Sequence, residues 1–153
     1  MTYNDLLLEA DAQDLITKEK HLFAYDGRIK GNRIAIRKGL SETQKKCVLA
    51  EEIGHFHTSS GNILSLSSVE DLKQESHARE WAFNKLIGLT GIINAYKHGC
   101  QSLYEIADYL EVTEEFLSEA LQQYKRKYGE YVVIDNYIIF FVPFLGVFES
   151  YTG

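Results

Sequence analysis

The sequence predicts an α+β fold in which helices and strands are segregated along the chain. Helical periodicity dominates residues 41–55 and 69–89, whereas strand-like patterns occupy residues 33–37 and 131–141. The two kinds of segment do not alternate regularly, which argues against a parallel sheet built from βαβ units. With 153 residues and 45% apolar content, the chain suits one compact domain with a sizeable core.

The first third of the chain is expected to contain a helix, a strand and a second helix. Leucines at helical spacing predict a helix over residues 3–17. The alternation of charged and apolar residues in Arg33–Arg37 predicts a half-buried strand. Ser41 and Gln44 form a capping box that would open the next helix, which continues through His55.

The remaining two thirds are expected to be mainly helical, with a hairpin near the end. Residues 59–68, rich in Ser, predict a loop before the helix at 69–89. Residues 104–128 predict two further helices, separated just before the N-cap candidate Thr113. Two aromatic and β-branched runs flank Asp135-Asn136, which predicts a hairpin.

Composition and charge exclude several classes of protein. A net charge of -6 and a pI of about 5.4 argue against a general polyanion binder, because phosphate contacts need clustered Lys and Arg. The two cysteines do not make a disulfide framework, and the acidic start of the chain does not resemble a signal peptide. The longest apolar run is too short to span a membrane. We therefore expect a cytoplasmic protein with no membrane association.

The string AEEIGHFHT, residues 50–58, is close to the H-E-x-x-H pattern of zinc peptidase helices. Glu51 and His55 are four residues apart and therefore share a helix face, with Glu52 beside them. Two side chains that hold a metal ion and a neighbouring carboxylate that accepts a proton from water are what a zinc hydrolase needs. Glu51 stands where the pattern has its first histidine.

Glu75 is the best candidate for a third metal ligand. It lies 20 residues after His55, on the helix predicted at 69–89, in register with Ala78, Ala82 and Leu86. A carboxylate on such an apolar stripe is costly unless it is paired or bound to a metal ion. His57 and His77 lie two residues from the proposed ligands and face roughly the opposite sides of their helices. Either histidine could replace Glu51 if the helix ended early, or donate a hydrogen bond to the reacting oxyanion.

The combination of CVLAEEIGHFHT with ESHAREWA and Leu86 resembles the ImmA/IrrE family of metallo-endopeptidases, in its phage and mobile-element branch. The resemblance extends upstream to DGRI and RIAI, and downstream to LYEIADYLEVTEEFLSEAL and YKRKYGEYVVIDNYIIFFVPFLGV. It implies a small zincin-like core of helices and a short sheet, with a C-terminal helical segment and hairpin. On this basis we expect a single domain over residues 1–153, with the zinc-helix core in 1–95 and the helical pair and hairpin in 96–153.

The resemblance also implies roles for individual residues. His55 and Glu75, with Glu51, would bind Zn²⁺, and Glu52 would be the general base. The strand at Arg33, Ile34, Ala35 and Ile36 could offer an edge to which an extended substrate adds. The expected substrate is a transcriptional repressor of a phage or mobile element, whose cleavage relieves repression.

Two other functions remain open from the sequence. Because a site with two carboxylates and one histidine leaves Zn²⁺ formally neutral, it should activate water less than a site with two histidines. The first alternative is therefore an impaired pseudo-peptidase that binds the repressor. The second is a DNA-binding regulator, since residues 106–121 have the spacing of a helix-turn-helix. Glu114, Glu115 and Glu119 on its second helix would repel phosphate, so we expect no direct contact with nucleic acid.

Overall fold

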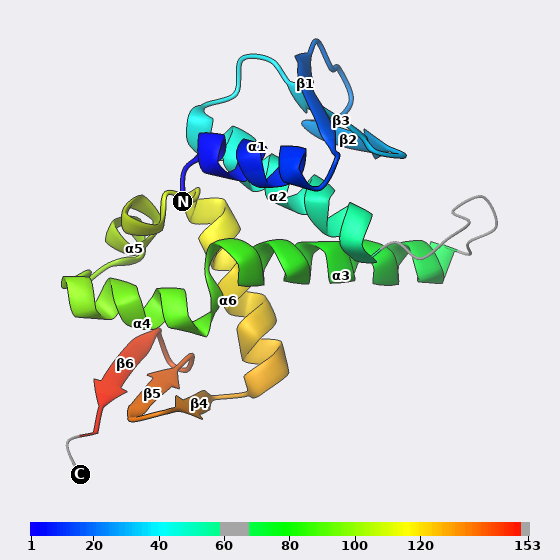
Figure 1. The fold of residues 1–153 in the computed structure, drawn as a ribbon. Coiled ribbons are helices and arrows are strands. Elements are labelled where there is room, and N and C mark those ends of the chain that lie inside the picture. Colours follow the sequence, from blue (N-terminus) through cyan, green and yellow to red (C-terminus); the bar gives the residue numbers. More distant parts are fainter. Residues whose placement is uncertain (59–67, 151–153) are drawn as a thin grey trace.

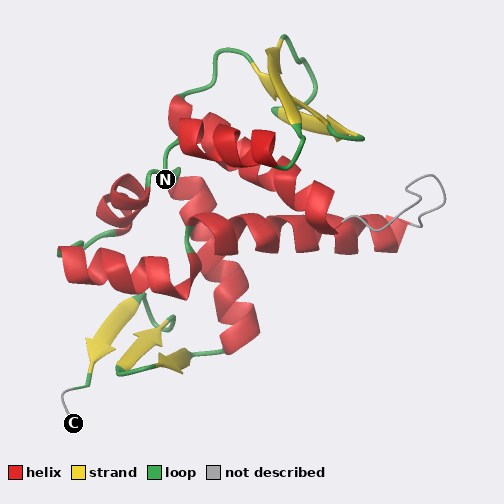
Figure 2. Cartoon of the chain, viewed as in Figure 1, coloured by secondary structure: helices red, strands yellow, loops and turns green. Residues whose placement is uncertain are grey.

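The computed structural model describes residues 1–58 and 68–150, with side chains described from residue 72 onward in the second range. Helices form the middle of the molecule, and two small sheets lie at its opposite ends (Figures 1 and 2). The α+β class predicted from the sequence is confirmed. In chain order the elements are α1 (Tyr3–Ala12), β1 (Ile16–Lys20), β2 (Gly27–Lys30), β3 (Arg33–Arg37), α2 (Glu42–Thr58), α3 (Ser68–Leu86), α4 (Gly88–His98), α5 (Leu103–Leu110), α6 (Glu114–Tyr128), β4 (Tyr131–Ile134), β5 (Tyr137–Phe140) and β6 (Gly146–Glu149).

The N-terminal sheet has the strand order β1-β3-β2, so β3 is its central strand. β1 pairs with β3 in parallel and β2 pairs with it antiparallel, through a turn at Gly31. The prediction that Arg33, Ile34, Ala35 and Ile36 offer a free edge is therefore wrong. Residues 16–20, of which Ile16 and Thr17 were expected to end the first helix, form β1 and cover one edge of β3. Among the described strands of this sheet, β1 and β2 are the edges.

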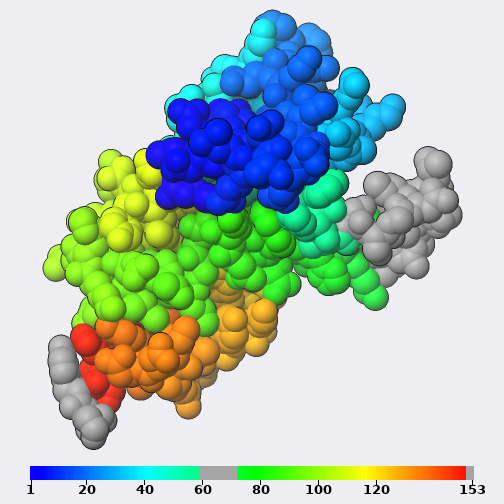
Figure 3. Space-filling view, in the orientation of Figure 1, coloured from blue at the N-terminus to red at the C-terminus, as the bar shows by residue number. Residues whose placement is uncertain are grey.

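α2 begins and ends close to where the sequence predicts. The Ser41 backbone N–H donates to Gln44 Oε1 at 2.9 Å, and the Gln44 N–H donates to Ser41 Oγ at 3.1 Å, which confirms the capping box. The helix continues three residues beyond His55 to Thr58. It packs against α1 and the N-terminal sheet, whose Ile34 and Ile36 are buried. In the space-filling view α1 covers the near side of α2, and the second sheet lies at the far end (Figure 3).

The C-terminal half contains two elements that the sequence did not predict. α3 ends at Leu86 and a separate helix, α4, follows from Gly88. The predicted hairpin is confirmed as β4 and β5, and β6 adds to it as a third antiparallel strand. Thr113 caps α6 by accepting from the Phe116 N–H at 3.0 Å, as predicted. Of the predicted loop 59–68, residues 59–67 lie outside the described part, and Ser68 begins α3.

One hydrophobic cluster runs through the described chain from Tyr3 to Phe141. α6 connects its two ends, since Phe116, Leu117 and Tyr124 are buried against neighbouring helices. The Tyr124 hydroxyl donates to Asn84 Oδ1 at 3.0 Å and accepts from the Gly88 N–H at 3.2 Å, so α6 is hydrogen-bonded to the α3–α4 junction. The described part contains no helix long and apolar enough to cross a membrane.

Candidate metal centre and peptide cleft

The helices α2 and α3 pack most closely at Gly54 and Ala78. A β-carbon at position 54 would lie 3.1 Å from the Ala78 carbonyl carbon and 3.3 Å from its Cα, and closer still to its oxygen. Glycine is therefore required here for the two backbones to approach. This contact sets the register in which polar side chains of the two helices face each other.

A cleft of about 990 Å³ opens beside this crossing. β2 and the two residues before it, α2, α3 and the first turns of α6 form its walls. Glu51, Glu52, His55 and Glu75 all line it, so the structure brings the predicted base and ligands to one cavity.

His55 and Glu75 are in direct contact across the cleft. His55 Nε2 lies 3.0 Å from Glu75 Oε2, with 25% and 52% of the two side chains exposed. Donors bound to one tetrahedral zinc ion at ~2.0–2.1 Å are separated by about 3.3 Å, so this spacing suits two ligands of a single ion. The predicted burial of Glu75 is wrong, however. Ala78 and Ala82 are buried as expected, but the first turns of α3 project beyond the end of α2 (Figure 1).

Glu51 has a different partner. Its Oε1 lies 3.9 Å from Arg79 Nε, and an Arg79 Nη lies 3.4 Å from Glu119 Oε2. Burial raises the pKa of Glu51 to about 7; Arg79 lowers this pKa, and Glu75, Glu119 and Asp26 raise it. The guanidinium therefore contacts the carboxylate expected to be the third ligand.

Glu52 lies beside Gly27 of β2, and both residues line the cleft. A β-carbon at position 27 would contact Val48 and lie 3.2 Å from Glu52 Cγ, so β2 approaches α2 closely only because residue 27 is glycine. Burial raises the pKa of Glu52 to about 7, with smaller contributions from the negative charges of Glu51 and Glu75. A carboxyl group with this pKa can both accept and return a proton near neutral pH.

His57 and His77 do not line the cleft. His57 stacks on Trp81 with ring centroids 5.0 Å apart, and His77 is exposed. Because α2 continues to Thr58, the early helix end that would have allowed a histidine to replace Glu51 does not occur.

As arranged, the side chains fit a metal ion only in part. His55 and Glu75 form a suitable pair, but no group of three His, Cys, Asp or Glu side chains in the described part is arranged to hold a metal ion. The candidate for a third ligand is Glu51, whose carboxylate lies beside Arg79.

Arg79 and Glu119 were not recognised from the sequence as residues of the cleft, although Arg79 follows Glu75 by one helical turn. That spacing is the same as the one between Glu51 and His55, which was used to recognise the site.

A family model described as the IrrE N-terminal-like domain, peptidase M78, matches residues 10–122. The chain belongs to this family. The matched range contains every residue that lines the cleft, from Tyr25 to Glu119. The IrrE-like domain is of the metallopeptidase type, and its small α+β fold agrees with the resemblance seen in the sequence. A comparison with curated proteins finds no match.

Proposed function

We propose that this IrrE-like protein is a zinc-dependent endopeptidase of the cytoplasm that cleaves a transcriptional repressor of a phage or mobile element. The observation that carries the proposal is the 3.0 Å contact between His55 Nε2 and Glu75 Oε2, with Glu52 in the same cleft. Family membership supports the assignment as a hydrolase.

In this proposal His55, Glu75 and Glu51 are the zinc ligands. A zinc ion held there would acidify water and polarise a peptide carbonyl. Glu52 accepts the proton of the attacking water and returns it to the leaving amine, a role that its place in the cleft beside His55 and Glu75 permits.

The substrate strand is proposed to lie along β2 rather than β3. β2 is an edge of the N-terminal sheet, and Gly27, Arg28, Ile29 and Lys30 all line the cleft. Addition of an extended peptide to this edge would place its backbone beside α2, where Glu52 lies. The exposed Arg28 and Lys30 side chains alternate with Gly27 and Ile29, so the strand is polar on one face only.

The experiment is derepression of a reporter gene that the repressor of the same genetic element controls. Cells that produce the wild-type protein should lose repression and accumulate repressor fragments. Glu52→Gln keeps the side chain's shape but removes the base, and we expect it to lower fragment formation by at least about 100-fold. Full derepression by Glu52→Gln, without fragments, would contradict cleavage.

A pseudo-peptidase is the second candidate, because the contact between Arg79 and Glu51 leaves the metal site without a third ligand. It would bind the repressor in the same cleft without cutting it. The same experiment separates the two functions, since only the pseudo-peptidase keeps its effect in Glu52→Gln.

Direct DNA binding is not part of the proposal. On α6, Glu115 and Glu119 line the cleft, and Phe116 and Leu117 are buried. The first turns of this helix, where DNA contacts were considered, therefore present carboxylates and apolar side chains, whereas its basic side chains lie in the last turn.

A further inference from the structure

Arg79 lies between two carboxylates that belong to different helices. Its Nε is 3.9 Å from Glu51 Oε1 on α2, and its Nη is 3.4 Å from Glu119 Oε2 on α6. We propose that Arg79 is a positioning residue that competes with the metal ion for the Glu51 carboxylate, and that Glu119 is its alternative partner. This inference rests on the proposed zinc site.

At the helix crossing, Arg79 faces Glu51. Glu51 and His55 lie one turn apart on α2, and Glu75 and Arg79 lie one turn apart on α3. Around the contact of Gly54 with Ala78, His55 faces Glu75 and Glu51 faces Arg79. The first pair has the chemistry of two metal ligands, whereas the second pair is a carboxylate with a permanent cation.

A guanidinium and a zinc ion compete for one carboxylate, because the positive charge of each weakens the attraction of that carboxylate for the other. The side chain of Glu51 is 26% exposed, so an uncompensated charge there is costly and the carboxylate needs a cation. Arg79 supplies that cation at present. When a metal ion binds this carboxylate, repulsion between the two positive charges favours movement of the guanidinium away from Glu51.

Glu119 is a second carboxylate that can pair with the displaced guanidinium. It already lies closer to Arg79 than Glu51 does, at 3.4 Å against 3.9 Å, and its side chain is 34% exposed. Removing Arg79 should therefore strengthen zinc binding, whereas removing the charge of Glu119 should leave Arg79 on Glu51 and weaken zinc binding. A residue that only stabilised the fold would not produce these opposite effects.

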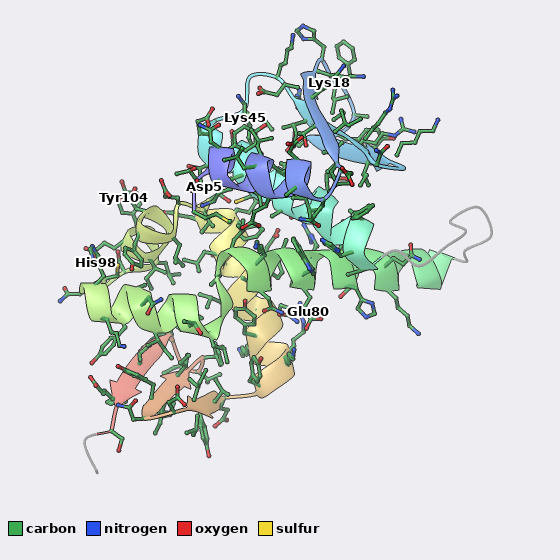
Figure 4. All side chains as sticks on the ribbon, in the orientation of Figure 1. Asp5, Lys18, Lys45, Glu80, His98 and Tyr104 are labelled. Atoms are coloured by element: carbon green, nitrogen blue, oxygen red, sulfur yellow. The ribbon has the colours of Figure 1, made fainter. Side chains whose placement is uncertain are left out.

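The test is the zinc dissociation constant, measured by competition with a chelating dye. The variants are Arg79→Met, Glu119→Gln and the double variant, with Lys127→Met as the control. Lys127 pairs with Glu80 at 2.9 Å, and Figure 4 shows Glu80 beside α6, on the side of α3 away from α2. The control thus removes one cation and one ion pair without touching the cleft.

We expect Arg79→Met to tighten zinc binding by at least about fivefold, the lower end of typical coupling between linked sites. Glu119→Gln should weaken it by a similar factor in the wild type and by less than about twofold in the Arg79→Met background. Lys127→Met should change it by less than about twofold.

The outcomes separate this inference from the proposed function. Measurable zinc binding that is unchanged or weaker in Arg79→Met overturns the inference and leaves the zinc site standing. An equal effect of Glu119→Gln in both backgrounds also overturns it, because Glu119 would then act by its own charge. Zinc binding by Arg79→Met alone supports the inference and favours the pseudo-peptidase for the wild type. The absence of zinc binding in every protein overturns both.

Discussion

Gly54 has no side chain at the point where α2 and α3 meet, and this absence sets the spacing of the whole site. Alanine is normally favoured over glycine inside a helix by about 1 kcal/mol. Here a β-carbon would lie 3.1 Å from the Ala78 carbonyl carbon, and backbone cannot move aside as a flexible side chain can. The steric cost therefore exceeds the gain in helix propensity.

We expect Gly54→Ala to lower the free energy of unfolding by about 1–3 kcal/mol, measured by urea denaturation. Gly91 in α4 is a matched control, since a β-carbon there meets Leu110 Cδ2 at 3.5 Å, an ordinary contact. Gly91→Ala should be neutral or stabilise the protein by up to about 1 kcal/mol. Equal effects of the two substitutions would contradict the close approach at Gly54.

The site residues show how far the sequence alone could lead. Helical spacing placed Glu51, Glu52 and His55 together, because residues three or four positions apart on one helix share a face whatever the fold. It could not place Glu119, since the contact with Arg79 depends on how α6 packs against α3. The burial of Glu75 was overestimated for the same reason: periodicity marks a face but does not tell where the neighbouring helix ends.

At the level of elements, those defined by local signals were predictable and those defined by distant partners were not. Ser41 with Gln44, Thr113 and the hairpin at Asp135-Asn136 each make contacts within a few residues. β1, by contrast, is stable because it pairs with β3. Its residue Ile16 pairs with Arg33, which lies 17 residues further along the chain. Such pairing leaves little trace in the strand's own sequence.

A buried lysine on α2 is hydrogen-bonded to the backbone just before α1 and at the end of α5. Lys46 on α2 is 2% exposed, and its Nζ donates to the Met1 carbonyl at 2.8 Å, just before α1, and to the Leu110 carbonyl at 3.0 Å, at the end of α5. Burial lowers the pKa of Lys46, and the negative charge of Glu111 partly opposes this effect. The ammonium group thus satisfies carbonyls from segments that are distant in sequence.

We expect Lys46→Met to lower the free energy of unfolding by about 1–3 kcal/mol, because it keeps the buried volume but leaves both carbonyls without a donor. The exposed Lys127→Met should cost at most about 1 kcal/mol by the same denaturation measurement. If Lys46→Met were as mild as Lys127→Met, the two hydrogen bonds would contribute nothing net to stability.

In the described part of the molecule, one hydrophobic cluster is continuous although the two sheets lie at opposite ends. The cluster extends from Tyr3 to Phe141, and α6 carries it from the cleft to the C-terminal sheet. That residues 1–153 form a single domain stays a prediction. The sequence could indicate an apolar content sufficient for one core, but not that a single helix would join its halves.

We expect thermal unfolding to give one calorimetric transition, with calorimetric and van't Hoff enthalpies that agree. Two resolved transitions, one for residues 1–95 and one for 96–153, would contradict a single cooperative unit.

Addition of zinc at about 100 times its dissociation constant should shift the thermal transition upward, because it stabilises the native state by about 2.7 kcal/mol. His55→Ala should abolish this shift.

The stacking of His57 on Trp81 has a practical consequence. Trp81 is the only tryptophan in the sequence, and it lies on α3 within one turn of Ala78. Its indole emission therefore comes from the helix crossing alone. A change in the packing of α2 against α3 at this stack would alter the surroundings of this one fluorophore. The protein thus carries an optical reporter of its helix crossing, which needs no attached dye.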